Sequence, residues 1–394
     1  MSNDREGAYV LPPMDIVHHG AGSVSALESV LADLNCENAL LITGTTLATK
    51  TELCDRVVAA SNGRIKQVFH DTKAHVPRSK VLAAARMARD MGADAVVSFG
   101  GGSPNDTAKG VVIALSEGIM ALDDFDRMRV IYEYPDKLEI PRLQGVPLPL
   151  IAIPTTLSAG EFTWFAGITD EDRQVKDLYI DRQITARAVI LDSALTLQTP
   201  LWLWLSTGMR SVDHCIEAIY SNQSHPYVDA TCSYALKILD QGLRDSKADP
   251  ANVAIRTELQ IAAWLSICGL GNVSLGISHG IGHQLGARCG VPHGQTSCVM
   301  LHNVLDFNLS HTKDQQSQIL NVMTQNGRSP KSAAEAVLQL VKDLNQPWRL
   351  RDVDVEEADF AGIAKDAMED IIVSSNPRPV SGTEEIIELL KLSY

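Results

Sequence analysis

The chain contains 394 residues, of which 45% are hydrophobic, and it carries a formal net charge of −14 at pH 7. This length can form two packed domains. The negative charge argues against nucleic acid and anionic membrane surfaces as partners, because both would repel it.

The apolar runs and the cysteines indicate the compartment. No apolar run reaches the ~18 residues that a membrane-spanning helix needs. Residues 1–7 are polar and Pro12 and Pro13 follow, so no signal peptide is predicted. The seven cysteines include no Cys-x-x-Cys pair, which favours a reducing environment. We therefore expect a cytoplasmic protein.

The pattern of predicted elements divides the chain into two parts. The first half alternates strands at 38–43, 67–70, 93–99 and 150–153 with helices at 78–91 and 106–115. This alternation predicts a parallel, doubly wound α/β sheet. Helical patterns dominate afterwards, at 209–220, 228–243, 253–267 and 332–344. We expect an α/β domain over residues 1–195 and an all-α domain over residues 196–394.

A glycine-rich turn follows the predicted strand at 93–99 and precedes a helix. It reads Gly100-Gly101-Gly102-Ser103, and Asp106 and Lys109 follow in the helix. Glycines let backbone N–H groups approach a phosphate closely, and the helix N-terminus adds partial positive charge. Ser103 or Asp106 could cap this helix. The turn matches neither of the usual glycine-rich phosphate motifs.

A second polar turn, which contains Thr155 and Thr156, follows the predicted strand at 150–153. Open parallel sheets bind ligands outside the carboxyl ends of their strands. Both turns are expected at that edge, so the first domain is predicted to bind a dinucleotide. Lys109 is expected to reach its phosphates.

Histidines cluster in the second half. His279, His283 and His293 fall within fifteen positions, and His214 lies upstream. On a helix, His279 and His283 would share one face. Pro292 and Gly294 flank His293 and predict a turn toward that face. Several imidazoles at one point indicate metal binding, proton transfer, or both.

Together these segments resemble the iron-containing (group III) alcohol dehydrogenase superfamily, which includes the maleylacetate reductases. The resemblance covers almost the whole chain and is carried by residues 19–23, 100–109, 153–156, 279–293 and 376–380. It implies an N-terminal nicotinamide-binding domain, a helical C-terminal domain, a reaction cleft between them, a small-molecule substrate and a homodimer.

One position departs from the family pattern. Metal-using members carry Asp-x-x-x-His around His214, whereas this chain has Arg210 at the aspartate position. His214, His279 and His293 match the other ligand positions, and His283 matches a histidine that contacts cofactor or substrate. A guanidinium has no lone pair for a metal. Asp213 is a poor substitute, because one helical residue corresponds to a rotation of ~100°.

The favoured hypothesis is therefore a metal-independent, NAD(P)H-dependent reduction of a small keto acid, similar to the maleylacetate reductases. Arg210 would polarise a carbonyl or bind a substrate carboxylate, and His283 or His279 would deliver a proton. One alternative is an iron- or zinc-dependent alcohol dehydrogenase with His214, His279 and His293 as ligands. A second alternative is an inactive nucleotide-binding scaffold.

The turn after the predicted strand at 38–43 bears on cofactor choice. NAD-preferring relatives tend to carry Thr-Asp there, whereas this chain has Thr43-Gly44-Thr45. Without that carboxylate, the 2′-phosphate of NADPH is not repelled. Gly44 and Thr45 are expected to contact the cofactor, and both NADH and NADPH are permitted.

Overall fold

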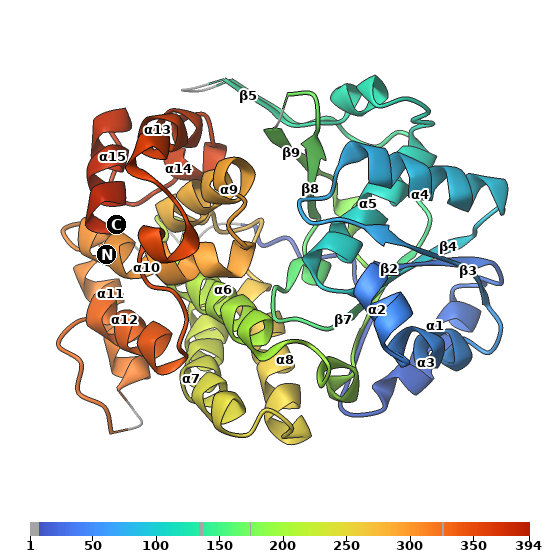
Figure 1. Ribbon diagram of the computed structural model, residues 1–394, viewed down its shortest axis with the longest axis horizontal. Helices are drawn as coiled ribbons and strands as arrows, with labels where there is room; N and C mark the ends of the chain where they lie inside the picture. The colour runs from blue at the N-terminus through green and yellow to red at the C-terminus, as the bar shows by residue number, and fades with distance from the viewer. Residues whose placement is uncertain (1–7, 134–136, 174, 325–326) are drawn as a thin grey trace.

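The structure is a computed structural model that describes residues 8–133, 137–173, 175–324 and 327–394. The polar segment 1–7, on which the signal-peptide prediction depends, lies outside the described residues. Figure 1 shows two halves side by side, with the sheet and its helices (blue to teal) facing a helical half (orange to red). The long helix α6 lies between them.

The first half is built on one six-stranded sheet in which every pairing is parallel. Its spatial order is β1-β10-β7-β4-β2-β3. All residues of β4, β7 and β10 are buried, which explains why the central strands are continuous apolar runs. The strands are β1 (Ile16–His19), β2 (Ala39–Gly44), β3 (Ile65–Thr72), β4 (Ala95–Gly100), β7 (Leu150–Pro154) and β10 (Ala188–Leu191).

Helices cover both faces of this sheet. Side chains of α1 (Leu27–Asp33) and α3 (Leu53–Ala60) belong to one buried cluster, and those of α4 (Arg78–Asp90) and α5 (Gly102–Ser116) belong to another. The short helix α2 (Thr45–Lys50) follows β2 directly. The strand β2 lies between β3 and β4, so the chain changes its direction of winding at β2 and β4. Ligands bind at such a switch point.

Two antiparallel hairpins interrupt the α/β pattern, and the sequence patterns did not predict them. The larger pairs β8 (Phe165–Asp170) with β9 (Val175–Ile180). Its strands alternate buried and less buried residues, as expected for a hairpin with one covered face. Figure 1 shows this hairpin between the two halves, beside α9. The smaller hairpin pairs β5 (Ile131–Glu133) with β6 (Lys137–Glu139).

The second half is helical, and α6 is its central element. Every residue of α6 from Trp204 to Tyr220 is buried, as expected of a helix that is surrounded on all sides. The helices are α6 (Leu201–Tyr220), α7 (Pro226–Ala248), α8 (Val253–Ile267), α9 (Ile277–Cys289), α10 (His293–Asn308), α11 (Lys313–Met323), α12 (Ala333–Asp343), α13 (Phe360–Met368), α14 (Ile371–Ser374) and α15 (Thr383–Leu392). Within the described residues, none of the helices is long and apolar enough to cross a membrane.

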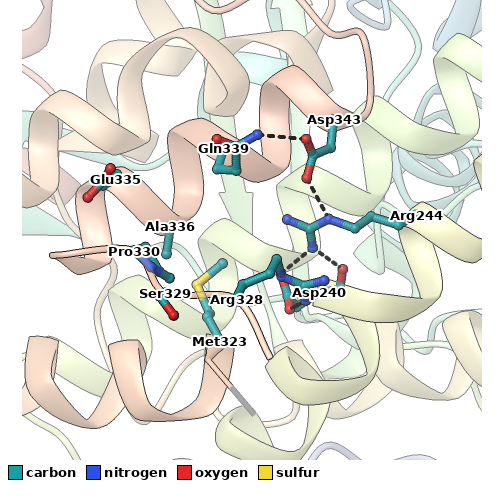
Figure 2. Close-up of a pocket in the computed structure, with 10 residues that line it drawn as sticks. All are labelled: Asp240, Arg244, Met323, Arg328, Ser329, Pro330, Glu335, Ala336, Gln339 and Asp343. Atoms are coloured by element: carbon teal, nitrogen blue, oxygen red, sulfur yellow. Dashed lines mark hydrogen bonds and ion pairs between the residues drawn. The ribbon is translucent and has the colours of Figure 1, made fainter. Parts of the chain in front are cut away.

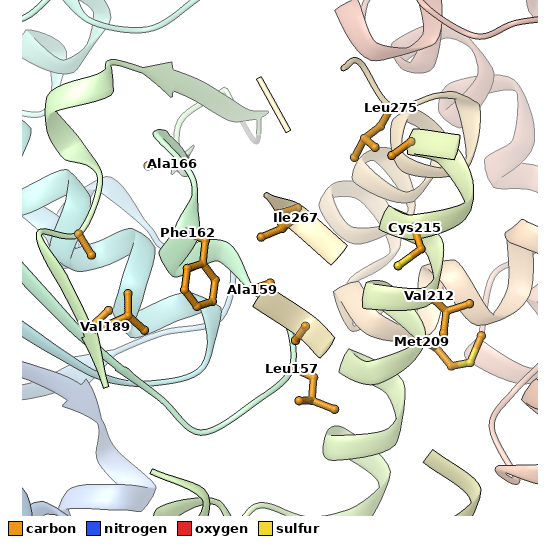
Figure 3. Close-up of a cluster of buried hydrophobic side chains, with 14 of the residues drawn as sticks. Leu157, Ala159, Phe162, Ala166, Val189, Met209, Val212, Cys215, Ile267 and Leu275 are labelled. Atoms are coloured by element: carbon orange, nitrogen blue, oxygen red, sulfur yellow. The ribbon is translucent and has the colours of Figure 1, made fainter. Parts of the chain in front are cut away.

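One hydrophobic core joins the two halves. Figure 3 shows Phe162 and Ala159, which follow β7, on one side of this core and Met209 and Cys215 of α6 on the other, and all belong to one buried cluster. The predicted fold class, a parallel α/β sheet followed by an all-α part, is confirmed. The strands β1 and β10 were not predicted. β1 is a segment of four mixed residues, whereas β10 is an apolar run as short as the predicted strand at 150–153.

Candidate active site

The glycine-rich turn lies at the carboxyl end of β4. Gly100 has a φ of +139°, and a Cβ there would lie 2.9 Å from Cγ of Pro104. A Cβ on Gly101 would lie 3.1 Å from Cγ2 of Thr156. The turn therefore needs glycine, both for its backbone conformation and for its close packing against the neighbouring turn.

The helix α5 begins at Gly102 without a side-chain cap, so the prediction that Ser103 or Asp106 caps it was wrong. Asp106 instead accepts a hydrogen bond from the backbone N–H of Gly167 in β8, at 3.2 Å. The first N–H groups of α5 therefore have no side-chain acceptor. Such groups bind phosphate at helix N-termini.

The turn with Thr155 and Thr156 lies directly beside the glycine-rich turn. The backbone N–H of Thr155 donates to the carbonyl of Gly100 at 2.9 Å, and both threonines are buried. Three side-chain hydroxyls bind this turn to the start of the helical half. Thr199 donates to the carbonyl of Thr155 at 2.7 Å, Ser211 donates to that of Leu157 at 2.6 Å, and the N–H of Leu157 donates to Thr207 at 3.1 Å.

Gly44 and Thr45 lie at the same edge of the sheet, where β2 ends beside β4. Thr45 is exposed, and its hydroxyl donates to the carbonyl of His70 at 2.9 Å. The hydroxyl proton of Thr45 is therefore already donated, but the hydroxyl oxygen can still accept a hydrogen bond. No carboxylate lies at residues 43–46 to repel a 2′-phosphate.

Asn105, which the sequence analysis missed, lies in the first turn of α5. Its side chain is 4% exposed, and neither its amide nitrogen nor its amide oxygen has a hydrogen-bond partner among the described residues. A buried, unpaired amide is costly unless a ligand or water completes it. The spacing signal was present, because Asn105 is only three residues beyond Gly102.

Lys109 does not lie where the sequence predicted. It is fully buried, and its ammonium donates to the carbonyls of Gly160, Thr163 and Phe165, at 2.7 Å each. A further bond of 3.1 Å reaches the hydroxyl of Thr163. These acceptors use the full donor capacity of the ammonium. Lys109 therefore connects α5 to the segment around the start of β8. The prediction that Lys109 reaches the cofactor phosphates was wrong.

The guanidinium of Arg210 lies inside the helical half, close to α9 and α10. Arg210 is 2% exposed, and its Nη1 donates to the hydroxyl of Ser297 at 3.2 Å. Its Nε is buried without a partner among the described residues. A Cβ on Gly282 would lie 2.7 Å from Oγ1 of Thr296 and 3.5 Å from Nη1, so this glycine lets α9 pack closely against α10 near the guanidinium.

His279 is fixed by a carboxylate from α6. Its Nδ1 lies 2.7 Å from Oε2 of Glu217, and its Nε2 is buried without a partner among the described residues. Glu217 also accepts from the N–H groups of Gly276 and Ser278 and from the hydroxyl of Tyr220. Four donors on one carboxylate hold the start of α9 against α6.

The four histidines lie as two stacked pairs. The ring centroids of His214 and His279 are 5.1 Å apart, and the ring centroids of His283 and His293 are 5.8 Å apart. A Cβ on Gly294 would lie 2.6 Å from the carbonyl of Ser206, so glycine lets the N-terminus of α10 approach α6. His293 is thus the first residue of α10, rather than part of a turn alone.

The pairs differ in exposure. His214 and His279 are buried, whereas His283 is partly exposed. Nδ1 of His283 lies 2.8 Å from Oδ2 of Asp370, which the sequence analysis missed because Asp370 lies 87 residues away along the chain. Enclosure by protein lowers the pKa of His214 and His279 well below the usual histidine value, and the charge of Arg210 lowers it further. These two imidazoles are therefore neutral at pH 7. His293, the first residue of α10, is exposed.

A second cation, Lys176 of β9, lies on the sheet side of this cluster. Burial lowers the pKa of Lys176, and the positive charge of Arg210 lowers it further. A Cβ on Gly167 would lie 2.3 Å from Cε of Lys176, so the glycine accommodates the aliphatic part of this side chain. The hairpin therefore contributes a positive charge to the region that contains Arg210 and His293.

The residues present do not fit a divalent metal. The carboxylate needed beside His214 is replaced by the Arg210 guanidinium, and two like charges ~4 Å apart interact by several kcal/mol at moderate dielectric. Asp213, Glu217 and His279 do bring ligand atoms within 4.8 Å of one another. Glu217, however, accepts from four donors, and Oδ2 of Asp213 accepts from two serine hydroxyls. Oδ1 of Asp213 and Nε2 of His279 have no partner among the described residues.

A glycine-rich turn at the switch point of a parallel sheet, followed by a helical half with clustered histidines, is typical of a nicotinamide-dinucleotide-dependent oxidoreductase. The sequence profile of iron-containing alcohol dehydrogenases matches residues 14–193, and that of the C-terminal part of the Fe-containing alcohol dehydrogenase family matches residues 204–394. The chain belongs to the iron-containing alcohol dehydrogenase family.

Relatives within this family act on different substrates. The chain is 31% identical to 1,3-propanediol dehydrogenase of Klebsiella pneumoniae over 76% of each chain. It is 28% identical to maleylacetate reductase of Pseudomonas sp. (strain P51), over 95% of this chain and 94% of the relative. A solved 1,3-propanediol oxidoreductase superposes with a TM-score of 0.87 at 26% identity, over 99% of this chain and all (100%) of the other.

The comparisons confirm the predicted family and the NAD(P)-dependent oxidoreductase class. The homodimer, the cytoplasmic location and the boundary between residues 195 and 196 stay predictions.

Replacement of Lys109 by Met is expected to destabilise the protein. The change leaves three buried carbonyls without their donor, so the free energy of unfolding should fall by about 2–5 kcal/mol. Urea denaturation followed by circular dichroism measures this fall. Lys80, half-exposed and paired with Asp71 at 2.7 Å, provides the control. Lys80→Met should cost less than about 1 kcal/mol. Equal losses for the two variants would contradict the structural role of Lys109.

Proposed function

We propose that the protein is an NAD(P)H-dependent, metal-independent reductase of a small keto acid, in which Arg210 takes the electrophilic role of the metal. One observation carries this proposal: a buried guanidinium lies at the position of the missing carboxylate ligand, next to neutral imidazoles. A guanidinium binds carboxylates and stabilises oxyanions.

The cofactor would lie across the carboxyl ends of β2, β4 and β7. The uncapped N–H groups of α5 fit its pyrophosphate, and Gly101 and Gly102 leave space for the backbone to approach it. Asn105 offers a donor and an acceptor that have no other partner among the described residues. When bound, the reduced nicotinamide supplies a hydride to an electron-poor carbon of the substrate.

The side chains of the helical half would stabilise the charge that this transfer creates. Negative charge develops on the substrate oxygen, and a donor already in place stabilises it most in a water-poor site. Nε of Arg210 has no partner among the described residues and is free to donate to such an oxygen. Lys176, from the opposite wall, adds positive charge that favours an anionic substrate.

Of the two histidines considered for proton delivery, we assign His283. Its ring is partly exposed, so it can exchange a proton with solvent, and Oδ2 of Asp370, 2.8 Å from Nδ1, holds the ring in a fixed orientation. His279 is enclosed and close to the charge of Arg210, which favours its neutral form. With Nδ1–H donated to Glu217, its Nε2 would accept rather than donate a hydrogen bond.

A metal-dependent alcohol dehydrogenase remains the second candidate, because two buried imidazole nitrogens, Nδ1 of His214 and Nε2 of His279, have no partner among the described residues. Metal analysis separates the two functions. Purified protein is expected to contain well under one iron or zinc per chain, and treatment with a chelator should leave its activity intact. Activity is measured by a screen of keto acids, including maleylacetate, with NADH and NADPH. Stoichiometric metal together with loss of activity on chelation would overturn the proposal.

Arg210→Asp tests the role of the guanidinium directly. This variant restores a carboxylate ligand beside three imidazoles, so it should bind zinc while its metal-free keto-acid reductase activity falls at least 100-fold. Arg210→Ala removes the charge without adding a ligand and serves as the matched control, with lost activity but weaker zinc binding. Titration calorimetry with zinc and steady-state kinetics provide the measurements. Metal-free activity at the wild-type level in Arg210→Asp would show that Arg210 plays no part in catalysis.

Gly101→Val tests the cofactor site and separates an enzyme from an inactive scaffold. The new side chain would enter the space 3.1 Å from Thr156, where the turn must approach the pyrophosphate. The dissociation constants of NADH and NADPH, measured by fluorescence titration, should rise at least tenfold, and the thermal unfolding midpoint should fall because the new side chain also crowds Thr156. A wild type that binds a cofactor but reduces none of the keto acids tested would fit the inactive nucleotide-binding scaffold.

A further inference from the structure

Asp213 is a buried acid within the helical half that the proposed reaction does not use. It is fully buried in α6, three residues after Arg210, so the two side chains lie on the same side of the helix. Its Oδ2 accepts from the hydroxyl of Ser278 in α9 at 2.8 Å and from that of Ser297 in α10 at 2.6 Å. The carboxylate therefore joins three helices that surround the histidine cluster.

Ser297 connects this carboxylate to the guanidinium. Its hydroxyl accepts from Nη1 of Arg210 at 3.2 Å and donates to Oδ2 of Asp213 at 2.6 Å. The direct separation between Nη1 and Oδ2 is 3.8 Å. The Ser297 hydroxyl thus bridges the guanidinium and the carboxylate through two hydrogen bonds. Nε of Arg210 has no partner among the described residues.

A buried guanidinium needs such a counter-charge. An unpaired ion inside a protein costs several kcal/mol, and the neutral imidazoles nearby cannot compensate it. Burial lowers the pKa of Arg210 to about 10, and the charge of Asp213 opposes this shift. Glu217 also lies on α6, but its oxygens are bound to His279, Tyr220 and two backbone N–H groups. Asp213 is therefore the acid available to Arg210.

We propose that Asp213, acting through Ser297, is the positioning residue that holds the Arg210 guanidinium in the orientation that binds the substrate. This inference rests on the proposed function, because it assumes that Arg210 contacts the substrate. Arg210 and Asp213 then act as one unit. The guanidinium can bind the substrate because Asp213, one turn further along the helix, holds it in position.

A double-mutant cycle tests this dependence. The four proteins are the wild type, Asp213→Asn, Arg210→Met and the double variant, each assayed with maleylacetate or with the keto acid that the wild type reduces fastest. We expect Asp213→Asn to raise KM at least tenfold, with a smaller change in kcat and a cofactor dissociation constant within twofold of the wild type. In the Arg210→Met background, Asp213→Asn should cause no further loss of kcat/KM. Losses that multiply would show that Asp213 acts independently of Arg210.

Ser297 provides a second test that keeps the buried charges. Ser297→Ala removes the connecting hydroxyl and should raise KM, whereas Ser297→Thr keeps a hydroxyl and should restore most of the wild-type KM. This pair also keeps the inference testable if Asp213→Asn fails to fold. Equal kinetics for Ser297→Ala and the wild type would overturn the proposed connection.

A buried acid outside the site supplies the matched control. Asp240 of α7 is 1% exposed and pairs with Arg244 and Arg328, beside a surface pocket of about 330 Å³ shown in Figure 2. Asp240→Asn removes a comparable buried charge, so it should lower the thermal unfolding midpoint without changing KM. An equal rise in KM would mean that the effect of Asp213→Asn comes from general destabilisation.

The two proposals fail in different ways. If Arg210→Met leaves KM and kcat unchanged, the proposed function fails and the inference fails with it. If Arg210→Met impairs the reaction but Asp213→Asn and Ser297→Ala both behave like the wild type, the inference alone is wrong.

Discussion

The arrangement of the helical half depends on a buried positive charge at Arg210. A guanidinium that is 2% exposed needs acceptors and negative charge nearby, and α10 supplies the Ser297 hydroxyl while α6 supplies the Asp213 carboxylate. The same packing brings His214 and His279 into the field of that charge and favours their neutral forms. A guanidinium in place of a carboxylate reverses the sign of the charge at this position, which favours an anion over a cation beside it.

Much of the fold was predictable because it depends on local patterns. The helix at 253–267 was predicted with the bounds that the structure gives, and the four predicted strands all belong to the parallel sheet. The hairpin of β8 and β9 and the strands β1 and β10 were not predicted. β1 is a short, mixed segment, and its partner β10 lies more than 160 positions away. The strand β10 is a short apolar run, and β8 and β9 pair with each other in a local hairpin.

The site was predictable in its residues but not in its contacts. The sequence placed Arg210, His279 and the glycine-rich turn in one functional region, whereas the bonds of Lys109 to three carbonyls depend on the packing of α5 against a distant loop. The helical rotation that argued against Asp213 as a metal ligand was sound, but the same geometry directs Asp213 to Ser278 and Ser297. Asp370 was missed because its partner His283 is close in space and not in sequence.

The hydroxyl bonds from Thr199, Thr207 and Ser211 to the turn at Thr155–Leu157 have a mechanical consequence. Thr207 and Ser211 lie on α6, the helix that bears Arg210, and Thr199 lies just before it. The turn beside the glycine-rich turn is therefore fixed to the start of this helix, so that a displacement of the turn would be transmitted to the guanidinium.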